Sequence, residues 1–307
     1  MNANIERLLT EITQYNNGKK LITLKENELL SRHSSFKIGG PARIFAIPTT
    51  YESLIFLLKT ATELNVRYYI LGNGSNILFD DDGFNGLVIS SSAFNKIEIN
   101  ENKLSVGCGA MLTACAVKAK EASLTGMECL FGIPGTIGGA VYMNAGAYGT
   151  EMCDITAKTK YIDLETMTLC EVEGDNHKFG YRHSIFKEIK AFILESELVL
   201  EKGNLNEISS AMDDYKQRRI FKQPLEYPSA GSTFKRYPGR YTGQMIDELG
   251  LKGRSVGGAQ VSEKHAGFII NKGCATCNDV LSLIEIVKSE IRKAYGIEIE
   301  TEVIYVK

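Results

Sequence analysis

Apolar residues recur every three or four positions in several stretches of the chain. Near its start, Ile5, Leu8, Leu9 and Ile12 fall on one helical face between charged residues. This spacing is typical of an amphipathic helix that buries one side. The same period predicts further helices over residues 51–65, 111–124, 206–221, 242–250 and 278–295.

Shorter runs of β-branched and aromatic residues stand between the predicted helices, and such runs are typical of β-strands. A glycine-rich turn is expected at 34–48, and the predicted strands cover residues 67–71, 86–90, 96–100, 103–107, 157–163, 191–200 and 296–306. The chain is therefore predicted to be an α+β protein in three sections. The sections are expected to pack closely, because no repeat or low-complexity linker separates them.

Composition narrows the class of protein. The 307 residues are 44% hydrophobic and 23% charged, which is typical of a globular protein long enough for two or three domains. The 35 basic and 37 acidic residues leave a net charge of -2. This balance favours neither a nucleic-acid partner nor a membrane surface, so an anionic ligand must be bound locally.

The cysteines and the first residues of the chain indicate the cellular compartment. Charged residues interrupt the first apolar pattern, unlike the core of a signal peptide, and no apolar run is long enough to cross a bilayer. Seven scattered cysteines, an odd number, suit reduced thiols better than a disulfide framework. We expect a cytoplasmic monomer.

Two motifs suggest other chemistry. Residues 253–257, GRSVG, match the elbow of serine hydrolases around Ser255. An elbow joins a strand to a following helix, whereas this segment follows a predicted helix and leads into a strand-like run. Between Ser255 and the nearby His265 the only acidic residue is Glu263, which does not suit the expected triad order. We predict a turn.

Cys274 and Cys277 form a C-x-x-C pair at the start of a predicted helix, where the helix dipole can lower a thiol pKa. Structural zinc normally needs two further ligands at similar spacing, and the chain has no second pair. We predict small residues beside a helix N-cap at Asn278.

Two glycine-rich stretches are candidates for phosphate binding: 71–76, LGNGSN, after a predicted strand, and 132–139, GIPGTIGG, about sixty residues later. Neither is a Rossmann or P-loop fingerprint. Both can present backbone N–H groups to phosphate oxygens, although a tight turn explains either one alone. Two such stretches with apolar neighbours favour a large dinucleotide.

Seven stretches together resemble one family. In order, and across nearly the whole chain, they resemble the UDP-N-acetylenolpyruvoylglucosamine reductases. The stretches are HSSFKIGGPA, LGNGSNILF, GIPGTIGGAVYMNAGAYG, YRHSIF, RRIFKQPLEYPSAGSTFKR, GLKGRSVGGAQVSEKHAGFIIN and ETEVIYV. The short chain resembles the type II form, and Ser34 and Ser35 stand where the family commonly has a threonine pair.

The resemblance implies a fold and a cofactor. The implied fold is the FAD-binding fold of the vanillyl-alcohol-oxidase (PCMH) type. It would have two α+β flavin-binding subdomains, 1–66 with the terminal strand 297–307, and 67–203, and an α+β substrate-binding domain, 204–296. The implied FAD-binding residues are Gly72, Asn73, Gly74, Ser75, Asn76, Gly132, Ile133, Pro134, Gly135, Thr136, Gly138, Gly139, Asn144 and Gly146.

The resemblance also implies a reaction. NADPH would reduce the enolpyruvyl group of UDP-N-acetylglucosamine enolpyruvate through bound FAD, giving UDP-N-acetylmuramate for peptidoglycan. Arg182 matches the arginine that stabilises the enolate, Glu302 the carboxyl group that polarises the intermediate, and Ser232 the general acid. Taken singly, each residue equally suits a solvated surface or a turn.

The implied diphosphate ligands are basic residues near Ser232, namely Arg218, Lys222, Lys235 and Arg236. A solvated basic face is the alternative for them, and we expect only a structural hydrogen bond from His265. Two other functions stay open: a flavin oxidase of the same fold, and a non-catalytic sugar-nucleotide binding protein. Many such oxidases hold FAD through a histidine, and none of the four histidines lies in a glycine-rich stretch.

Overall fold

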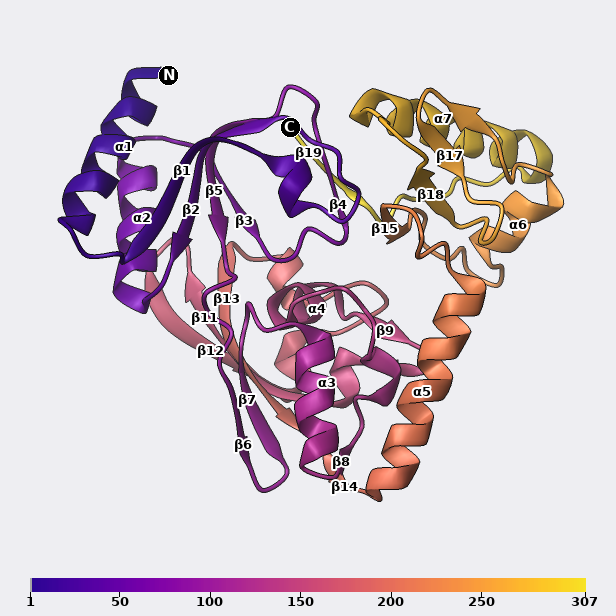
Figure 1. Ribbon diagram of the computed structural model, residues 1–307, viewed down its shortest axis with the longest axis horizontal. Helices are drawn as coiled ribbons and strands as arrows, with labels where there is room; N and C mark the ends of the chain where they lie inside the picture. The colour runs from indigo at the N-terminus through magenta and orange to yellow at the C-terminus, as the bar shows by residue number, and fades with distance from the viewer. Residues whose placement is uncertain (1) are drawn as a thin grey trace. The chain divides into compact units, whose positions relative to one another are not determined.

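The computed structural model describes residues 2–307, which form two compact units (Figure 1). Unit 1 consists of the chain up to Glu26, Arg43–Asn73 and Gly86–Gln217; unit 2 consists of Asn27–Ala42, Gly74–Asn85 and Arg218–Lys307. The two units are defined by which parts of the chain pack together, and not by which ligand they bind. The division into three ligand-binding domains therefore stays a prediction.

Unit 1 opens with two helices that pack together, α1 (Asn2–Asn16) and α2 (Tyr51–Glu63). The predicted face of α1 is confirmed, because Ile5, Leu8 and Ile12 are almost fully buried. Next to them is a four-stranded sheet in the order β1 (Ile22–Leu29), β2 (Pro41–Pro48), β5 (Phe84–Ser90) and β3 (Tyr68–Leu71). Strands β1 and β2 were not predicted, and the turn expected at 34–48 gives way to β2.

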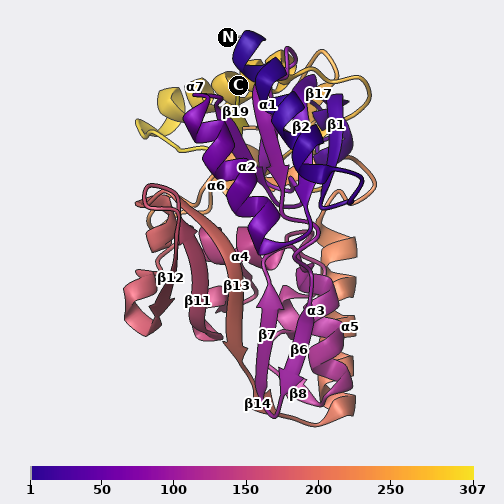
Figure 2. The same ribbon diagram turned by 90° about the vertical axis from the view of Figure 1, so that its left-hand side faces the viewer.

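The second sheet of unit 1 is antiparallel (Figure 2). Its order is β12 (Thr168–Glu173), β11 (Thr156–Asp163), β13 (Ala191–Val199), β7 (Lys103–Gly107) and β6 (Ile97–Asn100). Helix α4 (Ile137–Met143) contacts β13 and β7. Unit 1 also contains α3 (Leu112–Glu121), most of α5 (Leu205–Lys222), and the short strand pairs β8 (Leu124–Thr125) with β14 (Glu201–Lys202) and β9 (Gly146–Ala147) with β10 (Thr150–Glu151).

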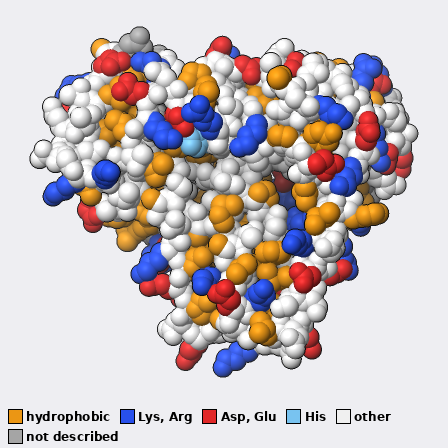
Figure 3. Space-filling model, viewed as in Figure 1, with side chains coloured by type: hydrophobic (Ala, Val, Ile, Leu, Met, Phe, Trp, Pro, Cys, Tyr) orange, Lys and Arg blue, Asp and Glu red, His pale blue; other side chains and the backbone are white. Residues whose placement is uncertain are grey.

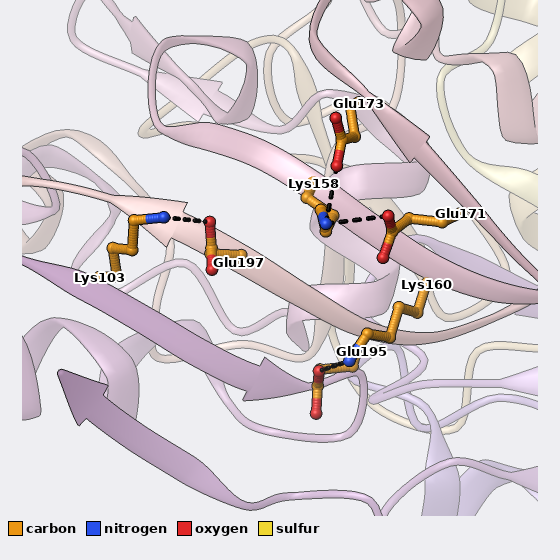
Figure 4. Close-up of polar contacts among 7 residues, drawn as sticks. All are labelled: Lys103, Lys158, Lys160, Glu171, Glu173, Glu195 and Glu197. Carbon is orange, nitrogen blue, oxygen red and sulfur yellow. Dashed lines mark hydrogen bonds and ion pairs between the residues drawn. The ribbon is translucent and has the colours of Figure 1, made fainter.

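Ion pairs cross the strands of this sheet (Figure 4). Lys158 lies 2.9 Å from Glu171 and 2.7 Å from Glu173 on the neighbouring strand. Lys160–Glu195 and Lys103–Glu197 continue the row at 2.9 and 3.0 Å. Ion pairs on a solvated sheet face contribute little stability because water and salt screen them, so their main effect is to favour this strand register.

Unit 2 contains a sheet in the order β15 (Ser229–Ser232), β18 (Phe268–Asn271), β17 (Ala259–Val261) and β16 (Ser255–Val256). Helix α7 (Cys277–Tyr295) packs on this sheet and on α6 (Thr242–Glu248). Its apolar face joins a core separate from that of unit 1. Strand β4 (Ile77–Phe79) pairs in parallel with β19 (Ile304–Val306).

Two sequence predictions are wrong here. Helix α7 is capped by Thr276 and not by Asn278, because the Thr276 hydroxyl accepts the Asp279 N–H while the Asp279 carboxylate accepts the Thr276 N–H. The final strand is also shorter than the predicted 296–306. Before Ile304 the chain runs beside the segment after β15 and is joined to it by isolated hydrogen bonds, such as the one from the Lys235 N–H to the Glu300 carbonyl at 2.9 Å.

The surface and the thiols agree with the composition. On the face in Figure 3, basic and acidic side chains are interspersed. All seven cysteines are free thiols. Across residues 2–307, no helix is long and apolar enough to cross a membrane, and no group of three or more His, Cys, Asp or Glu side chains is arranged to hold a metal ion.

Candidate functional site

The two glycine-rich stretches meet within unit 1. The Asn73 side-chain amide donates a hydrogen bond of 2.6 Å to the carbonyl of Pro134. A Cβ on Gly72 would lie 2.6 Å from the Thr136 hydroxyl oxygen, which is closer than real Cβ contacts allow. Glycine at 72 therefore lets one stretch lie directly on the other.

The stretch from Gly132 to Gly139 offers fewer free donors than expected, because helix α4 begins inside it. The Ile137 N–H donates to the Ala110 carbonyl and the Gly138 N–H to the Cys108 carbonyl, at 2.8 Å each, just after strand β7. The N–H groups of Gly135 and Thr136, by contrast, make no hydrogen bond to any described residue. Thr136 is buried, and an unsatisfied buried N–H costs about 1–3 kcal/mol, which a ligand oxygen would offset.

The other stretch adds a run of donors. Within residues 2–307, the N–H groups of Asn73, Gly74 and Ser75 also lack a hydrogen-bond partner. Gly74 has a φ of +62°, and a Cβ there would lie 2.1 Å from the carbonyl oxygen of His33. Only glycine allows this turn. In both stretches, bare backbone with unused N–H groups fits an anionic cofactor.

The serines of HSSFKIGG hold the second half of this loop in unit 2. The Ser35 N–H donates to the Gly74 carbonyl at 3.2 Å, and the Ser35 hydroxyl donates to the Ser229 carbonyl at 2.6 Å. The Ser34 hydroxyl accepts the Phe36 N–H at 3.1 Å. Ser229 contributes only its backbone carbonyl, and it lies 194 positions from Ser35, so no local sequence pattern marks this contact.

Arg182 lies on a tight turn of unit 1. Its φ is +54°, and Gly180 and His183 exchange N–H to carbonyl bonds of 3.1 and 3.0 Å beneath it. The partly exposed guanidinium carbon lies 5.2 Å from the ring centroid of Tyr181. The turn thus holds Arg182 on a closed loop of backbone.

Two side-chain bonds fix this turn to the end of helix α4. The Asn144 amide donates to the Gly180 carbonyl at 3.0 Å, and the buried Ser184 hydroxyl donates to the Tyr142 carbonyl at 2.8 Å. Asn144 also donates to the Glu151 carboxylate at 2.8 Å and accepts the Cys153 N–H at 2.9 Å. The side chain of Asn144, an implied FAD-binding residue, is thus hydrogen-bonded within the protein.

Hairpin β9–β10 follows directly after this cap. A Cβ on Gly146 would lie 2.6 Å from the Thr150 carbonyl oxygen. Gly146 therefore allows the hairpin to close tightly beside Asn144, and this is the contact that the structure assigns to it.

Ser232 and Glu302 lie on neighbouring backbone segments of unit 2. The Glu302 N–H donates to the Thr233 carbonyl at 2.8 Å, and the Asn76 amide donates to the Glu302 carbonyl at 3.1 Å. Thr233 is itself held by its N–H bond of 2.8 Å to the Gly267 carbonyl. Two of the predicted catalytic residues are thus brought together by backbone pairing.

The predicted diphosphate ligands are all cations with some exposure. Helix α5 (Leu205–Lys222) reaches far enough to place Arg218 and Lys222 on one exposed face. Lys235 forms an ion pair of 2.6 Å with Glu300, and the guanidinium carbon of Arg236 lies 5.2 Å from the Tyr241 ring centroid.

His265 has the structural hydrogen bond expected of it. Its Nδ1 accepts the Gly267 N–H at 3.2 Å, close to the contact that holds Thr233. Burial lowers the pKa of His265, and the nearby cations Lys252 and Lys222 lower it further. Both effects favour the neutral ring, in which Nδ1 can accept.

The other motifs carry no further chemistry. Ser255 begins strand β16 instead of lying in the predicted turn, and its hydroxyl donates to the Gly253 carbonyl at 3.1 Å and accepts from the Gln260 amide at 3.0 Å. Cys274 is exposed and Cys277 is buried, both as free thiols, and burial raises the pKa of Cys277 to about 12.

Comparison with known proteins places these residues in context. The FAD binding domain family matches residues 42–169, and the C-terminal domain family of UDP-N-acetylenolpyruvoylglucosamine reductase matches residues 223–306. The reductase from Caldanaerobacter subterraneus subsp. tengcongensis is 46% identical over 90% of this chain and 91% of its own. The chain belongs to the UDP-N-acetylenolpyruvoylglucosamine reductase family.

Other members of this reductase family agree over the full length. The protein from Fervidobacterium nodosum is 42% identical over 99% of this chain and 97% of its own. The crystal structure of the Thermus caldophilus reductase is 33% identical, with a TM-score of 0.81 over 93% of this chain and all of that one. The predicted fold, an FAD-binding fold of the PCMH type with a C-terminal α+β domain, is confirmed.

The two family matches divide the predicted site. Both glycine-rich stretches lie within the FAD binding domain match, whereas Ser232 and Glu302 lie within the reductase match. Arg182, Arg218 and Lys222 lie outside both. The individual roles of all these residues stay predictions.

Proposed function

We propose that the chain reduces UDP-N-acetylglucosamine enolpyruvate to UDP-N-acetylmuramate with NADPH, through bound FAD, in cytoplasmic peptidoglycan precursor synthesis. The observation that carries this proposal is an FAD binding domain joined to a reductase-specific C-terminal domain, with relatives 42–46% identical over about nine tenths of the chain or more.

The backbone of the two glycine-rich stretches would hold the FAD diphosphate. The unused N–H groups of Gly135 and Thr136 supply donors from one stretch, and those of Asn73, Gly74 and Ser75 from the other. Such donors neutralise phosphate charge without a lysine. When bound, FAD supplies the carrier that passes hydride from NADPH to the enolpyruvyl group.

Arg182 would stabilise the negative charge that develops on the substrate carboxylate and C2 after hydride reaches C3. A planar guanidinium can donate two parallel bonds to such a group. The bonds from Asn144 and Ser184 hold the turn before substrate arrives, so the arginine is preorganised.

Ser232 would then donate its hydroxyl proton to C2, with Glu302 helping to polarise the intermediate. A serine hydroxyl is a very weak acid, so the alkoxide left on Oγ needs a nearby cation. Lys222 and Lys235 are the candidates. A proton that returns to Oγ from solvent completes the cycle.

Arg218, Lys222, Lys235 and Arg236 would bind the diphosphate of the sugar nucleotide. Lys235 is already paired with Glu300, whose side chain is 74% exposed. Because so exposed a pair contributes only about 0–1 kcal/mol, a diphosphate can displace the carboxylate.

A visible spectrum and an anaerobic assay of the purified protein separate this proposal from its alternatives. We expect non-covalent FAD, and NADPH oxidation that depends on the enolpyruvyl substrate without oxygen. An oxidase would consume oxygen without that substrate. A binding protein would contain no flavin and gain none from added FAD, and this result would refute the proposal.

A further inference from the structure

His177 is a fully buried histidine, five residues before Arg182 in unit 1. Its Nδ1 lies 2.9 Å from the Gly174 carbonyl oxygen, and its Nε2 lies 3.0 Å from the Thr159 hydroxyl. A carbonyl oxygen only accepts hydrogen bonds, so Nδ1 carries the proton. In the neutral ring Nε2 then accepts the proton of the Thr159 hydroxyl.

The chain of bonds continues across the sheet. Thr159, on β11, lies 3.1 Å from the Ser196 hydroxyl on β13, and both side chains are fully buried. Because the Thr159 proton is directed to His177, Ser196 donates to Thr159. The hydrogen bonds from buried Ser196 through Thr159 and His177 to the exposed Gly174 carbonyl therefore run in one direction. Burial lowers the pKa of His177, which keeps the ring neutral and the direction fixed.

The His177 ring also contacts both arms of the Arg182 turn. Phe179 stacks on it at 4.8 Å with an interplanar angle of 5°, on the side before the turn. Phe186, on the side after it, meets the ring edge-on at 6.4 Å. A displaced His177 would therefore release both arms of the turn together.

We propose that the Ser196–Thr159–His177 chain positions the Arg182 turn on the five-stranded sheet, and that His177 is a positioning residue for the reaction. The proposal rests on the proposed function, in which Arg182 acts on the substrate. The bonds from Asn144 and Ser184 attach the turn to α4; the His177 chain attaches its base to β11 and β13.

Two threonines of β11 provide a matched test. The Thr159 hydroxyl joins His177 to Ser196, whereas the Thr156 hydroxyl is buried and has no hydrogen-bond partner among residues 2–307. Valine replaces either threonine at nearly constant shape. Thr159→Val therefore breaks the chain, and Thr156→Val is the control. His177→Phe, which keeps a ring but loses both bonds, is the second test.

The first readout needs neither flavin nor substrate. Amide hydrogen exchange at Gly180 and His183 reports opening of the turn, because these two residues bond to each other. We expect Thr159→Val and His177→Phe to lower protection there roughly tenfold, the scale of one buried hydrogen bond. Thr156→Val should stay within about twofold of the wild type. Equal protection in both threonine variants would overturn the proposal.

The second readout separates positioning from stability. We expect Thr159→Val to keep flavin reduction by NADPH within about twofold and to slow reoxidation by the enolpyruvyl substrate roughly tenfold. Normal reoxidation despite lost protection would make the chain merely structural and overturn the proposal. Arg182→Ala tests the function itself: if it does not slow reoxidation, the assigned role of Arg182 fails, whatever the exchange data show for the chain.

Discussion

The Arg182 turn of unit 1 and the Ser232–Glu302 pair of unit 2 differ in the hydrogen bonds that attach them to neighbouring segments. Side chains fix the first, through Asn144 and Ser184. A backbone bond from the Glu302 N–H to the Thr233 carbonyl joins the second, with one side-chain bond from Asn76 beside it. Backbone bonds form with almost any residue type, whereas side-chain bonds need particular residues. We therefore expect the Arg182 turn to be more easily disturbed by substitution around it.

The largest effect should come from removing a reactive group where the backbone pairing stays intact. Ser232→Ala should reduce its flavin with NADPH at nearly the normal rate. Reoxidation by the enolpyruvyl substrate should slow roughly 10²–10⁴-fold, the usual contribution of general acid catalysis. Stopped-flow absorbance of the two half-reactions measures this.

Ser232→Cys keeps a donor of similar size and should recover part of the loss. If Ser232→Ala keeps normal reoxidation and only raises KM, the hydroxyl is a binding or turn group. The proton would then come from Glu302 or water.

The next effect tests the side-chain attachment. Asn144→Gly keeps the φ of +44° accessible but removes the bonds to Gly180, Glu151 and Cys153. We expect a loss of about 1–3 kcal/mol in the free energy of unfolding, and slower reoxidation of reduced flavin. Thr233→Val leaves the buried Ile269 N–H without its acceptor beside Ser232, and should cost a similar amount, about 1–3 kcal/mol, with less effect on reoxidation.

Urea unfolding of the two variants, with the half-reactions alongside, measures this difference. Equal sensitivity of reoxidation in both variants would remove the distinction between the two regions.

The sequence predicts the parts of the fold that depend on local patterns better than those that depend on particular side-chain contacts. Helical spacing correctly predicted helix α7, whose Val280, Leu283 and Val287 are buried, because that pattern is local. The order of motifs predicted the fold through resemblance. Helix α4 was missed because Gly138 and Gly139 are poor helix formers. Packing requires glycine at 138 all the same, because a Cβ there would lie 2.9 Å from the Cys108 Cβ.

Contacts between distant residues were beyond sequence analysis. His177 and Thr159 are 18 positions apart, and Asn73 and Pro134 are 61 apart. Nothing local marks either pair, because only the fold brings them together. Strands β1 and β2 were missed for a related reason: their pairing partners, and not their own alternation, define them.

A smaller effect is expected at the basic face of α5. Arg218→Ala and Lys222→Ala should each raise KM for the sugar nucleotide about tenfold, the scale of one charge-assisted hydrogen bond. Flavin reduction by NADPH should be largely unchanged, because neither residue lies in a glycine-rich stretch. Steady-state kinetics at fixed NADPH measures this KM. If KM is unchanged in both variants, Arg218 and Lys222 form a solvated basic face that does not bind the diphosphate.

The smallest effect concerns pH and compares one histidine from each unit. Burial lowers the pKa of His177 and of His265 below the usual value. As pH falls below about 6.5, the unfolded chain therefore binds protons that the folded chain does not. The free energy of unfolding should fall between about pH 7 and pH 5, by less than about 1.4 kcal/mol per pH unit for each histidine.

His177→Phe should remove its share of this slope, and His265→Phe should remove the other. Urea unfolding across this range measures both shares. A slope that neither variant changes would mean that other groups cause it.

The most direct test of the proposed reaction is an anaerobic experiment on the purified protein with its flavin. NADPH is added until the flavin is reduced, the nicotinamide is removed, and UDP-N-acetylglucosamine enolpyruvate is mixed in. The account predicts that the oxidised flavin spectrum returns and that UDP-N-acetylmuramate forms in equal amount to the flavin. A flavin that stays reduced with this substrate, and reoxidises only when oxygen is admitted, would contradict it.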